Sequence, residues 1–376
     1  PDPYFNPNLS NSDELYSIQP YRNSALSLSD ITVIFVSHNF NLEGAPIHLF
    51  NLIKALTKIG LKAAVISHQA GPLMQRYQQL GIPCAVCNVN TAQFIESPGE
   101  YADALCAKIF KELAIEHADL LFANTLQTYW ACILASQIDL PYVWNIHESE
   151  PAASYFDFLP LELRALAYES FGVSYRNIFV SKASFRVWES FDSNNNCVVV
   201  NTAMPDTPIL PLAKRERCAA RAKIGIDTSD IMFLNIGTVC ARKNQAEIID
   251  AFCLMDDAQR RNVKLVFVGA HDSQEGQALL NRVSKLPKNV QKAIKFVPET
   301  DEVDTYYQSA DVFVFSSILE SYPLVILEAM KFELPILTAP VFGVTEQVIN
   351  EFNAIFYSQG DASGLKDKIT MLANDS

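Results

Sequence analysis

The sequence of 376 residues has no concentration of positive charge and no long apolar run. Its 29 lysines and arginines are outnumbered by 42 aspartates and glutamates, giving a net charge of −13, and they form no basic run of the kind that binds nucleic acid. No stretch of about 18 apolar residues is free of charge, and the N-terminus lacks the basic-then-apolar pattern of a signal peptide. These absences predict a cytoplasmic protein without a nucleic acid partner.

Three patterns that indicate other chemistries are also missing. The eight cysteines are scattered, and the single C-x-x-C, from Cys84 to Cys87, has no second pair and no histidine at the spacing of a zinc site. No D-x-D, the usual acidic handle for a metal-bound diphosphate, occurs. No G-x-G-x-x-G follows an expected strand, which removes the main support for a nicotinamide dehydrogenase. We therefore expect reduced structural cysteines, no metal and no cofactor.

The sequence does contain enough apolar material for two domains. Hydrophobic residues make up 49% of it, and a domain usually takes about 100–200 residues. Residues 1–30, rich in Asn, Ser, Pro and Tyr, lack periodicity and are interpreted as an irregular lead. A proline-rich stretch begins after residue 201 and interrupts the pattern of secondary structure. We expect a first domain over 31–204 and a second over 205–376.

Short β-branched or aromatic runs alternate with longer segments of helical spacing, the pattern of βαβ units. One such segment, 46–60, has Pro at its start and Gly at its end, as helices often do. Nearly continuous apolar strands predict parallel sheets covered by helices on both faces, and hence two Rossmann-like, doubly wound α/β domains. Ligands of such sheets bind beyond the carboxyl ends of the strands, which places the site in the cleft where the domains face each other. The expected strands are 31–37, 63–67, 119–124, 142–146, 177–181 and 197–201, then 231–237, 264–270, 294–297, 311–317, 335–338 and 354–357.

The strongest motif is SSILESYPLVILEAM, in which Glu320 follows an expected strand and Glu328 lies eight residues later in an apolar helix. Burying an ionised carboxylate such as Glu328 without partners costs several kcal/mol, roughly, so something must hydrogen-bond to it. The two hydroxyls of a sugar diol would serve, whereas the alternative is an internal ion pair, for which Lys331 is the candidate at helical spacing.

This segment resembles the E-x7-E signature of the retaining glycosyltransferases of family 4, and the resemblance extends over most of residues 31–376. It implies the GT-B fold, in which two Rossmann-like domains face each other across a cleft. In that family the second glutamate binds the ribose hydroxyls of the nucleotide and the first lies against the transferred sugar, which implies these roles for Glu328 and Glu320. The resemblance also implies that the backbone amides of three residues face the sugar and the phosphates: Ser321, Tyr322 and Leu324.

A second motif, NIGTVCARKNQ, ends an expected strand at Gly237 and places Arg242 and Lys243 ahead of a helix. Two cations beside a helix N-terminus suit a pyrophosphate, although two solvated surface cations would give the same pattern. The family usually has Arg directly after the glycine, where this sequence has Thr238, and often Gly after the lysine, where it has Asn244. Lys243 matches the family lysine, and we expect Arg242 to compensate for the missing arginine.

Three further loops follow expected strands. Gly44, in SHNFNLEGAP, is similar to a family glycine whose loop approaches the phosphates and the acceptor, but it could equally supply only a turn. His147, in WNIHESEP, matches a family histidine that contacts the transferred sugar, and His38 is a weaker candidate of the same type. Gly343 and Glu346 match a family loop that opens a helix beside the nucleotide, where Glu346 could equally offset the helix dipole.

Together these residues and the resemblance to family 4 imply transfer of a hexosyl group from a nucleoside diphosphate sugar to a hydroxyl acceptor with retention of configuration. UDP-glucose or a related UDP-hexose is the first expectation for the donor and GDP-mannose the second, because the family uses both. The acceptor, a glycan or a lipid-linked sugar in polysaccharide or glycoconjugate biosynthesis, is expected on residues 31–200. Family members often dock on membranes through a basic first domain, whereas this one is acidic, so contact with the inner membrane surface is expected to be weak or absent.

Two other functions stay open from the sequence. A hydrolysing nucleotide-sugar epimerase shares the two-domain fold but is not expected to carry the glutamate pair. A non-catalytic sensor of sugar nucleotides or glycans would have kept the fold and lost turnover, and retention of Glu320, Glu328 and Lys243 argues against it.

Overall fold

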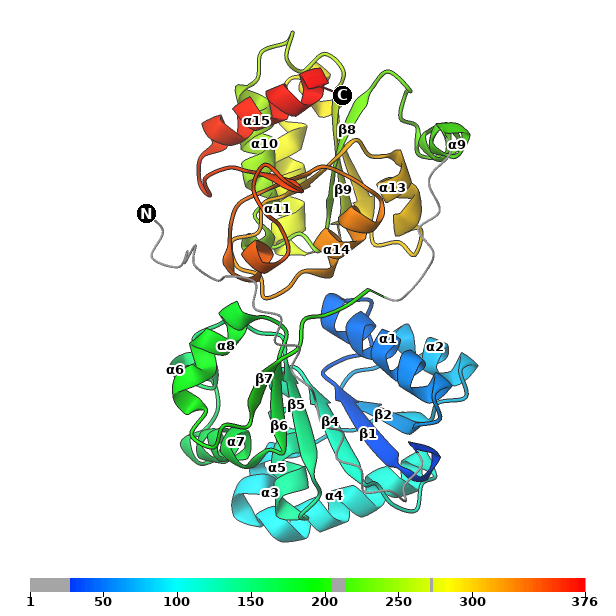
Figure 1. Cartoon of the computed structure of the whole chain (residues 1–376), viewed down its shortest axis with the longest axis vertical. Helices are drawn as coiled ribbons and strands as arrows, with labels where there is room; N and C mark the ends of the chain where they lie inside the picture. The colour runs from blue at the N-terminus through cyan, green and yellow to red at the C-terminus, as the bar shows by residue number, and fades with distance from the viewer. Residues whose placement is uncertain (1–27, 205–213, 271–272, 376) are drawn as a thin grey trace, which may run out of the picture.

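The structure is a computed structural model that describes residues 28–204, 214–270 and 273–375. Two parallel sheets, each covered by helices, lie one beyond the other along the long axis of the molecule (Figure 1). This arrangement confirms the two doubly wound α/β domains. The expected domain boundary, between residues 204 and 205, lies at the edge of a segment outside the described residues. Most of the expected irregular lead also lies outside them, so both stay predictions.

The first sheet has seven strands in the order β3-β2-β1-β4-β5-β6-β7, and all neighbouring strands are parallel. Its strands are β1 (Thr32–Ser37), β2 (Lys62–Ser67), β3 (Cys84–Val86), β4 (Leu120–Asn124), β5 (Tyr142–Ile146), β6 (Arg176–Phe179) and β7 (Cys197–Val199).

The second sheet has six parallel strands in the order β10-β9-β8-β11-β12-β13. Its strands are β8 (Ile231–Ile236), β9 (Val263–Ala270), β10 (Ile294–Pro298), β11 (Val312–Phe315), β12 (Ile336–Thr338) and β13 (Ala354–Phe356).

Helices connect and cover the strands of both sheets (Figure 1). In the first domain they are α1 (Gly44–Lys58), α2 (Leu73–Gln79), α3 (Thr91–Glu96), α4 (Pro98–Leu113), α5 (Tyr129–Gln137), α6 (Ala152–Tyr155), α7 (Leu161–Val173) and α8 (Lys182–Trp188), with the short 3₁₀ helices η1 (Leu28–Asp30), η2 (Leu126–Thr128) and η3 (Glu189–Phe191). In the second domain they are α9 (Lys214–Ile224), α10 (Gln245–Leu254), α11 (Gln274–Ser284), α12 (Lys288–Gln291), α13 (Val303–Ser309), α14 (Leu324–Lys331) and α15 (Ala362–Asp375), with η4 (Ala241–Lys243) and η5 (Phe342–Glu346).

The strands read as continuous apolar runs because both faces of each sheet are buried. Along β1, Ile34 and Val36 join one apolar cluster, while the alternating Val33 and Phe35 join another on the opposite face. All six residues of β1 are buried. No helix among the described residues is both long and apolar enough to cross a membrane.

The structure differs from the sequence expectations at short elements. β3 is absent from the expected strands because its three residues, Cys-Ala-Val, lack the β-branched or aromatic run that marks the strands that were expected. The element that follows β12 is the 3₁₀ helix η5 rather than an α-helix. α1 begins at Gly44, two residues before the expected start, so that Pro46 lies in its first turn, where the missing N–H costs nothing.

Candidate active site

The predicted site residues all follow strands at the carboxyl edge of a sheet or lie in the helix next to it. In Figure 1, α14 and the loops around it face the first domain. The loop after β1 leads to Gly44, and the loop after β5 carries His147. In the second domain the loops after β8, β11 and β12 carry, respectively, Gly237 with Arg242 and Lys243, Glu320 with Ser321 and Tyr322, and Gly343.

Glu320 lies at the centre of a cluster of charges in the second domain. Its side chain is 9% exposed, and Oε1 pairs with the Arg242 guanidinium and with Lys243 Nζ, the latter at 2.7 Å. Arg242 Nη1 also donates to the Leu319 carbonyl at 3.0 Å, and the Arg242 carbonyl accepts from the Ile318 amide at 2.8 Å. The loops after β8 and β11 are therefore joined through these contacts, and the two predicted cations meet the first glutamate of the E-x7-E segment.

The glycine that ends β8 makes room for Lys243. Gly237 has φ +147°, and a Cβ there would lie 3.6 Å from Lys243 Cε. A Cβ on Gly269, at the end of the neighbouring strand β9, would come within 2.9 Å of the Gly237 carbonyl oxygen. The two strand ends approach each other closely, which holds the β8 loop in place beneath the lysine.

Asn244 explains one departure from the family pattern. It lies between η4 and α10 with φ 49° and ψ 39°, the left-handed region that glycine enters freely and asparagine tolerates best among the other residues. Its side-chain amide donates to Glu247 Oε2 at 2.7 Å. The backbone conformation that the family glycine would adopt is therefore kept here by an asparagine.

Three backbone amides lie open beside Glu320. In the described part of the chain, the N–H groups of Ser321, Tyr322 and Leu324 have no hydrogen-bond acceptor. Leu324 is the first residue of α14, where N–H groups are free of intrahelical partners and the helix dipole favours an anion. These donors, with Lys243 and Arg242, form a group suited to phosphate oxygens.

Glu328 is held by a hydroxyl rather than by an ion pair. Tyr307 Oη donates to Glu328 Oε2 at 2.7 Å, and the Tyr307 ring is 1% exposed and stacked on Phe332. Burial raises the pKa of Glu328, and the Tyr307 hydrogen bond partly offsets this. No ion pair with Lys331 occurs within the described residues. One carboxylate oxygen of Glu328 is thus fixed from α13, and the other has no partner among the residues described.

His147 lies in a network of amide side chains across the cleft. Its Nε2 is 3.0 Å from Asn124 Oδ1 and 2.8 Å from Asn145 Nδ2. The ring of His48, on α1, packs edge-on against it at 5.2 Å between centroids. Burial, with the neighbouring His48 and His38, holds the pKa of His147 well below its usual value, so the ring is neutral at pH 7.

Glu148 was not among the predicted site residues. Its carboxylate accepts from the Leu126 amide at 2.9 Å and from the His147 amide at 3.0 Å, which ties the loops after β4 and β5 together. Burial raises the pKa of Glu148 to about 7. The only sequence signal is its position next to His147 after a strand; its partner Leu126 is 22 residues away.

The loop after β1 is held by a carboxylate at the start of α1. Glu43 accepts from His38, Asn39 and Asn41, and these contacts, that of His38 first, lower its pKa to about 2. A Cβ on Gly44 would meet no atom within 4 Å, so packing within the protein does not require glycine there. His38 therefore anchors the loop, and the role predicted for Gly44 stays a prediction.

Gly343 and Glu346 contact the first domain. A Cβ on Gly343 would lie 1.4 Å from the Ser321 carbonyl oxygen and 3.3 Å from Ser181 Cβ, and its amide donates to the Glu320 carbonyl at 3.1 Å. The Glu346 carboxylate accepts from the backbone of α8 rather than stabilising its own helix. Gly343 thus packs closely against the Glu320 loop, and its predicted place beside the nucleotide stays a prediction.

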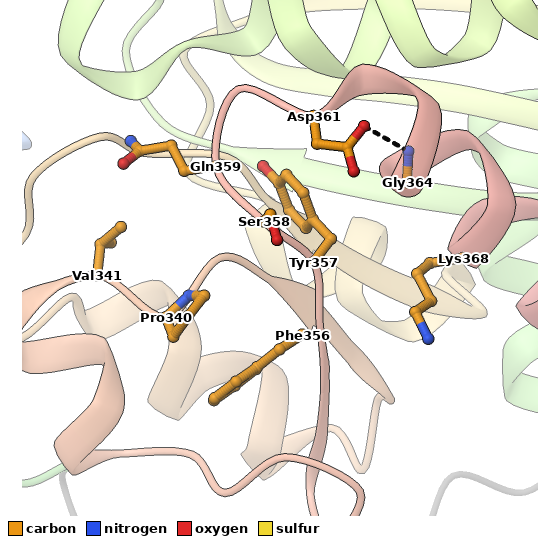
Figure 2. Close-up of a pocket in the computed structure, with 9 residues that line it drawn as sticks. All are labelled: Pro340, Val341, Phe356, Tyr357, Ser358, Gln359, Asp361, Gly364 and Lys368. Carbon is orange, nitrogen blue, oxygen red and sulfur yellow. Dashed lines mark hydrogen bonds between the residues drawn. The ribbon is translucent and has the colours of Figure 1, made fainter. Parts of the chain in front are cut away.

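A cavity of about 370 Å³ lies elsewhere, between the loop after β12 and the start of α15 (Figure 2). Its lining includes Phe356 and Lys368, and Asp361 accepts from the Gly364 amide at 2.9 Å there. None of the residues that line it is a predicted site residue. The eight cysteines are free, and no group of His, Cys, Asp and Glu within the described residues is placed to hold a metal.

Comparisons with known proteins identify the family of the second domain and relatives of the whole chain. Residues 216–376 match the model of the family described as glycosyl transferases group 1. An uncharacterized glycosyltransferase of Methanocaldococcus jannaschii is 26% identical over 326 residues, covering 83% of this chain and 80% of that protein. The N,N'-diacetylbacillosaminyl-diphospho-undecaprenol alpha-1,3-N-acetylgalactosaminyltransferase of Campylobacter jejuni is 22% identical over 353 residues, 91% of this chain and 89% of that protein.

A solved structure shows the same fold over nearly the whole chain. Anabaena HepE, crystallised in complex with UDP-glucose, has a TM-score of 0.76 and 18% identity over 92% of this chain and 90% of its own. With two facing parallel-sheet domains, the E-x7-E segment between β11 and α14 and the family match over residues 216–376, the chain has the GT-B fold, and its second domain is that of a group 1 glycosyltransferase.

Proposed function

We propose that this protein transfers a hexosyl group from a nucleoside diphosphate sugar to a hydroxyl of a glycan or lipid-linked acceptor, in polysaccharide or glycoconjugate biosynthesis. The observation that carries the proposal is the meeting of Arg242 and Lys243 at Glu320, beside three open backbone amides. Fixed cations and amide donors at a helix start are suited to a diphosphate leaving group.

The charge cluster around Glu320 also suggests the order of events when a donor binds. Without a donor, the two cations compensate Glu320, whose side chain is 9% exposed. A bound diphosphate would compete for both cations, because it carries more negative charge than one carboxylate. Glu320 would then be free to accept hydrogen bonds from the hydroxyls of the transferred sugar.

Glu328 is proposed to bind the ribose of the donor. Its partnered oxygen is fixed by Tyr307, so the remaining oxygen can accept from a ribose hydroxyl without the carboxylate having to rotate. UDP-glucose or a related UDP-hexose is our first choice of donor and GDP-mannose the second. The UDP-glucose complex of HepE, a protein of the same fold, supports the first choice.

Retention and independence of metal are parts of the same proposal. Arg242, Lys243 and the open amides supply the positive charge that a metal would otherwise bring to the leaving group. A front-face route, in which the departing phosphate oxygen accepts the proton of the acceptor hydroxyl, needs positioning rather than a protein nucleophile. The neutral His147 can hydrogen-bond a sugar hydroxyl from the other side of the cleft.

The acceptor is proposed to bind the first domain, at the loops after β1, β4 and β5. The Campylobacter relative, by its name, acts on a diphospho-undecaprenol-linked sugar. We propose a cytoplasmic location, with weak or no membrane contact, for this acidic chain. Co-sedimentation with vesicles of anionic lipid tests the location at a membrane surface.

The first experiment is a thermal-shift and turnover screen with UDP-glucose, UDP-galactose, UDP-N-acetylglucosamine and GDP-mannose, with and without EDTA. We expect one donor to raise the melting temperature by several degrees at saturation, EDTA to change nothing, and Glu328→Ala to weaken binding by about tenfold or more. Glu275→Gln, an exposed acid on α11 with no partner among the described residues, is the matched control and should bind like the parent protein.

The anomeric configuration of the product, read by NMR, tests retention. Donor consumption with an inverted product would refute the retaining part alone. Binding of a donor without turnover over a broad set of acceptors would favour a non-catalytic sensor, and release of an epimerised sugar without acceptor would favour an epimerase. A folded protein that binds no sugar nucleotide would refute the proposal as a whole.

A further inference from the structure

The two domains meet through a chain of serine hydroxyls. Ser149 Oγ, in the first domain, is 2.7 Å from Ser321 Oγ in the second. It is also 2.9 Å from Ser184 Oγ, which lies 3.0 Å from Ser181 Oγ at the start of α8. Ser149, Ser181 and Ser184 are buried, whereas Ser321 is half-buried, so the chain is shielded from water except at its Ser321 end.

A carboxylate of the second domain, that of Glu346, accepts hydrogen bonds from α8. Glu346 Oε2 accepts from the Lys182 amide at 2.9 Å and Oε1 from the Ala183 amide at 2.8 Å. Both donors belong to the first turn of α8, where backbone N–H groups have no intrahelical acceptor and an anion is favoured. The two hydrogen bonds are charge-assisted, and because each carboxylate oxygen has its own backbone donor, they fix the orientation of the carboxylate.

These contacts end on the residues that carry the proposed chemistry. Ser321 follows Glu320 directly, and Ser149 lies two residues after His147. The backbone runs one residue from Glu320 to Ser321 and two residues from His147 to Ser149. These three steps between Cα atoms span about 11 Å in total, so the Ser149–Ser321 hydrogen bond lies close to both site residues. Gly343, three residues before Glu346, donates its amide to the Glu320 carbonyl. The loop with Glu320 is thus held partly by its own domain and partly by the opposite one.

A second contact between the domains is of a different kind. Arg76, on α2, pairs with Asp301 at 2.6 Å, but the side chains are 38% and 70% exposed. Exposed ion pairs contribute little because water and salt screen them. Glu346 is exposed as well, but it differs from this ion pair because it accepts two hydrogen bonds from backbone N–H groups that α8 holds in place. Glu346 and the largely buried hydroxyls are therefore the contacts that can fix how the two domains meet.

We propose that Glu346, together with the Ser149–Ser321 pair, is an interdomain latch whose role is to position Glu320 against His147 in the closed cleft. Glu346 and Ser149 are positioning residues: they act on the sugar through the Glu320 loop and do not touch the donor. The effect of the latch on turnover rests on the proposed function, whereas its effect on how the two domains meet does not. When the latch is lost, donor binding by the second domain persists and turnover falls.

The test compares the parent protein with Glu346→Ala, Glu346→Gln and Arg76→Gln. For Glu346→Ala we expect kcat to fall by about tenfold or more, with the Kd for UDP-glucose changed less than twofold, because the reacting groups are misplaced while the donor site is intact. Glu346→Gln keeps one acceptor oxygen, so its kcat should lie between those of Glu346→Ala and the parent protein. Arg76→Gln, the control for an exposed interdomain contact, should keep kcat within twofold.

Small-angle scattering with UDP-glucose bound gives a readout that does not depend on turnover. A larger radius of gyration for Glu346→Ala than for the parent protein supports the latch, and an equal one overturns it. Unchanged kcat overturns it too, as does a Kd that weakens in parallel with kcat, since Glu346 would then be a donor contact. If the parent protein shows no turnover, the proposed function fails, and the latch is judged by scattering alone.

The serine pair provides an independent arm. Ser321→Ala removes the hydrogen bond to Ser149, whereas Ser149→Ala removes this bond and the contact with Ser184. We therefore expect the double variant to lose no more kcat than Ser149→Ala alone. Multiplying losses would mean that the two hydroxyls act separately, which overturns their part in the latch. Circular dichroism confirms that each variant is folded before its kinetics are interpreted.

Discussion

At the scale of single residues, burial decides which groups in the cleft are charged near neutral pH. Burial lowers the pKa of His48 to about 4 and holds that of His147 well below its usual value, so this pair of rings is neutral. Glu43 is the opposite case, because hydrogen bonds from its neighbours, chiefly His38, lower its pKa to about 2. The role that we propose for His147 is therefore that of a hydrogen-bonding group and not that of a cation for the diphosphate.

Glu148 gives a prediction about stability and pH. Burial raises its pKa from 4.5 to about 7, so between these values the folded protein holds a proton that the unfolded chain has lost. The stability contributed by this group is fully present below pH 4.5 and is lost as the pH rises through 7. We expect Glu148→Gln, which cannot ionise, to remove about 1–3 kcal/mol of this pH dependence.

The measurement follows the fluorescence of tryptophan during thermal unfolding between pH 4.5 and 8. Trp130, Trp144 and Trp188 are all buried in the first domain, which also contains Glu148, so the signal reports the correct domain. Glu275→Gln, in the second domain, should keep the slope of the parent protein. Equal slopes for the parent protein and Glu148→Gln would show that Glu148 is ionised in the folded state throughout.

Some of the proposed site residues could be predicted from the sequence, whereas their partners could not, for a physical reason. Glu320 and Lys243 follow strands in a parallel sheet, and the carboxyl ends of such strands meet at one edge. Tyr307 is 21 residues from Glu328, and Ser149 is 172 residues from Ser321. Nothing local marks these partners, since a buried tyrosine or serine is ordinary in any core, and only the folded chain brings them together.

At the scale of elements, apolar pattern and length decide what can be predicted. Strands such as β1 and β9, with buried residues along their length, were predicted to within one residue of their bounds. β3 was not, because Cys-Ala-Val contains only one β-branched residue, and η5 was expected as an α-helix because nothing in its sequence separates a 3₁₀ turn from the start of an α-helix. The loop that connects η4 to α10 depends instead on one backbone conformation, that of Asn244.

Asn244 allows a test of that conformation. Asn244→Ala puts a Cβ without a helpful side chain at φ 49° and removes the hydrogen bond to Glu247, so we expect a loss of about 1–2 kcal/mol in the free energy of unfolding. Asn244→Gly loses only the hydrogen bond and should cost less. Urea unfolding followed by far-UV circular dichroism measures both, since tryptophan fluorescence reports only the first domain. A glycine variant as unstable as the alanine variant would show that the hydrogen bond, not the backbone, matters.

At the scale of the whole molecule, the cleft works only if its two walls meet in one arrangement. The second domain holds the proposed donor groups, while His147 and the proposed acceptor loops belong to the first. Each sheet could be predicted from its own strands, but the contacts between the domains could not, because they join loops without periodicity. η5 is an element where the walls meet, since a Cβ on Gly343 would meet both the Ser321 carbonyl and the Ser181 side chain.

Gly343→Ala tests how tightly the walls must meet. The added Cβ would lie 1.4 Å from the Ser321 carbonyl oxygen, closer than any contact allows, so η5 or the Glu320 loop must move. Because the hydrogen bond from Gly343 to Glu320 shares this space, we expect turnover to fall about a hundredfold, while thermal unfolding of the first domain, read by tryptophan fluorescence, changes little. Gly172→Ala in α7, where a Cβ meets no atom within 4 Å, should keep full turnover. If Gly343→Ala turned over like the parent protein, the Glu320 loop would have room to shift without loss, and close contact between the walls could not be what positions it.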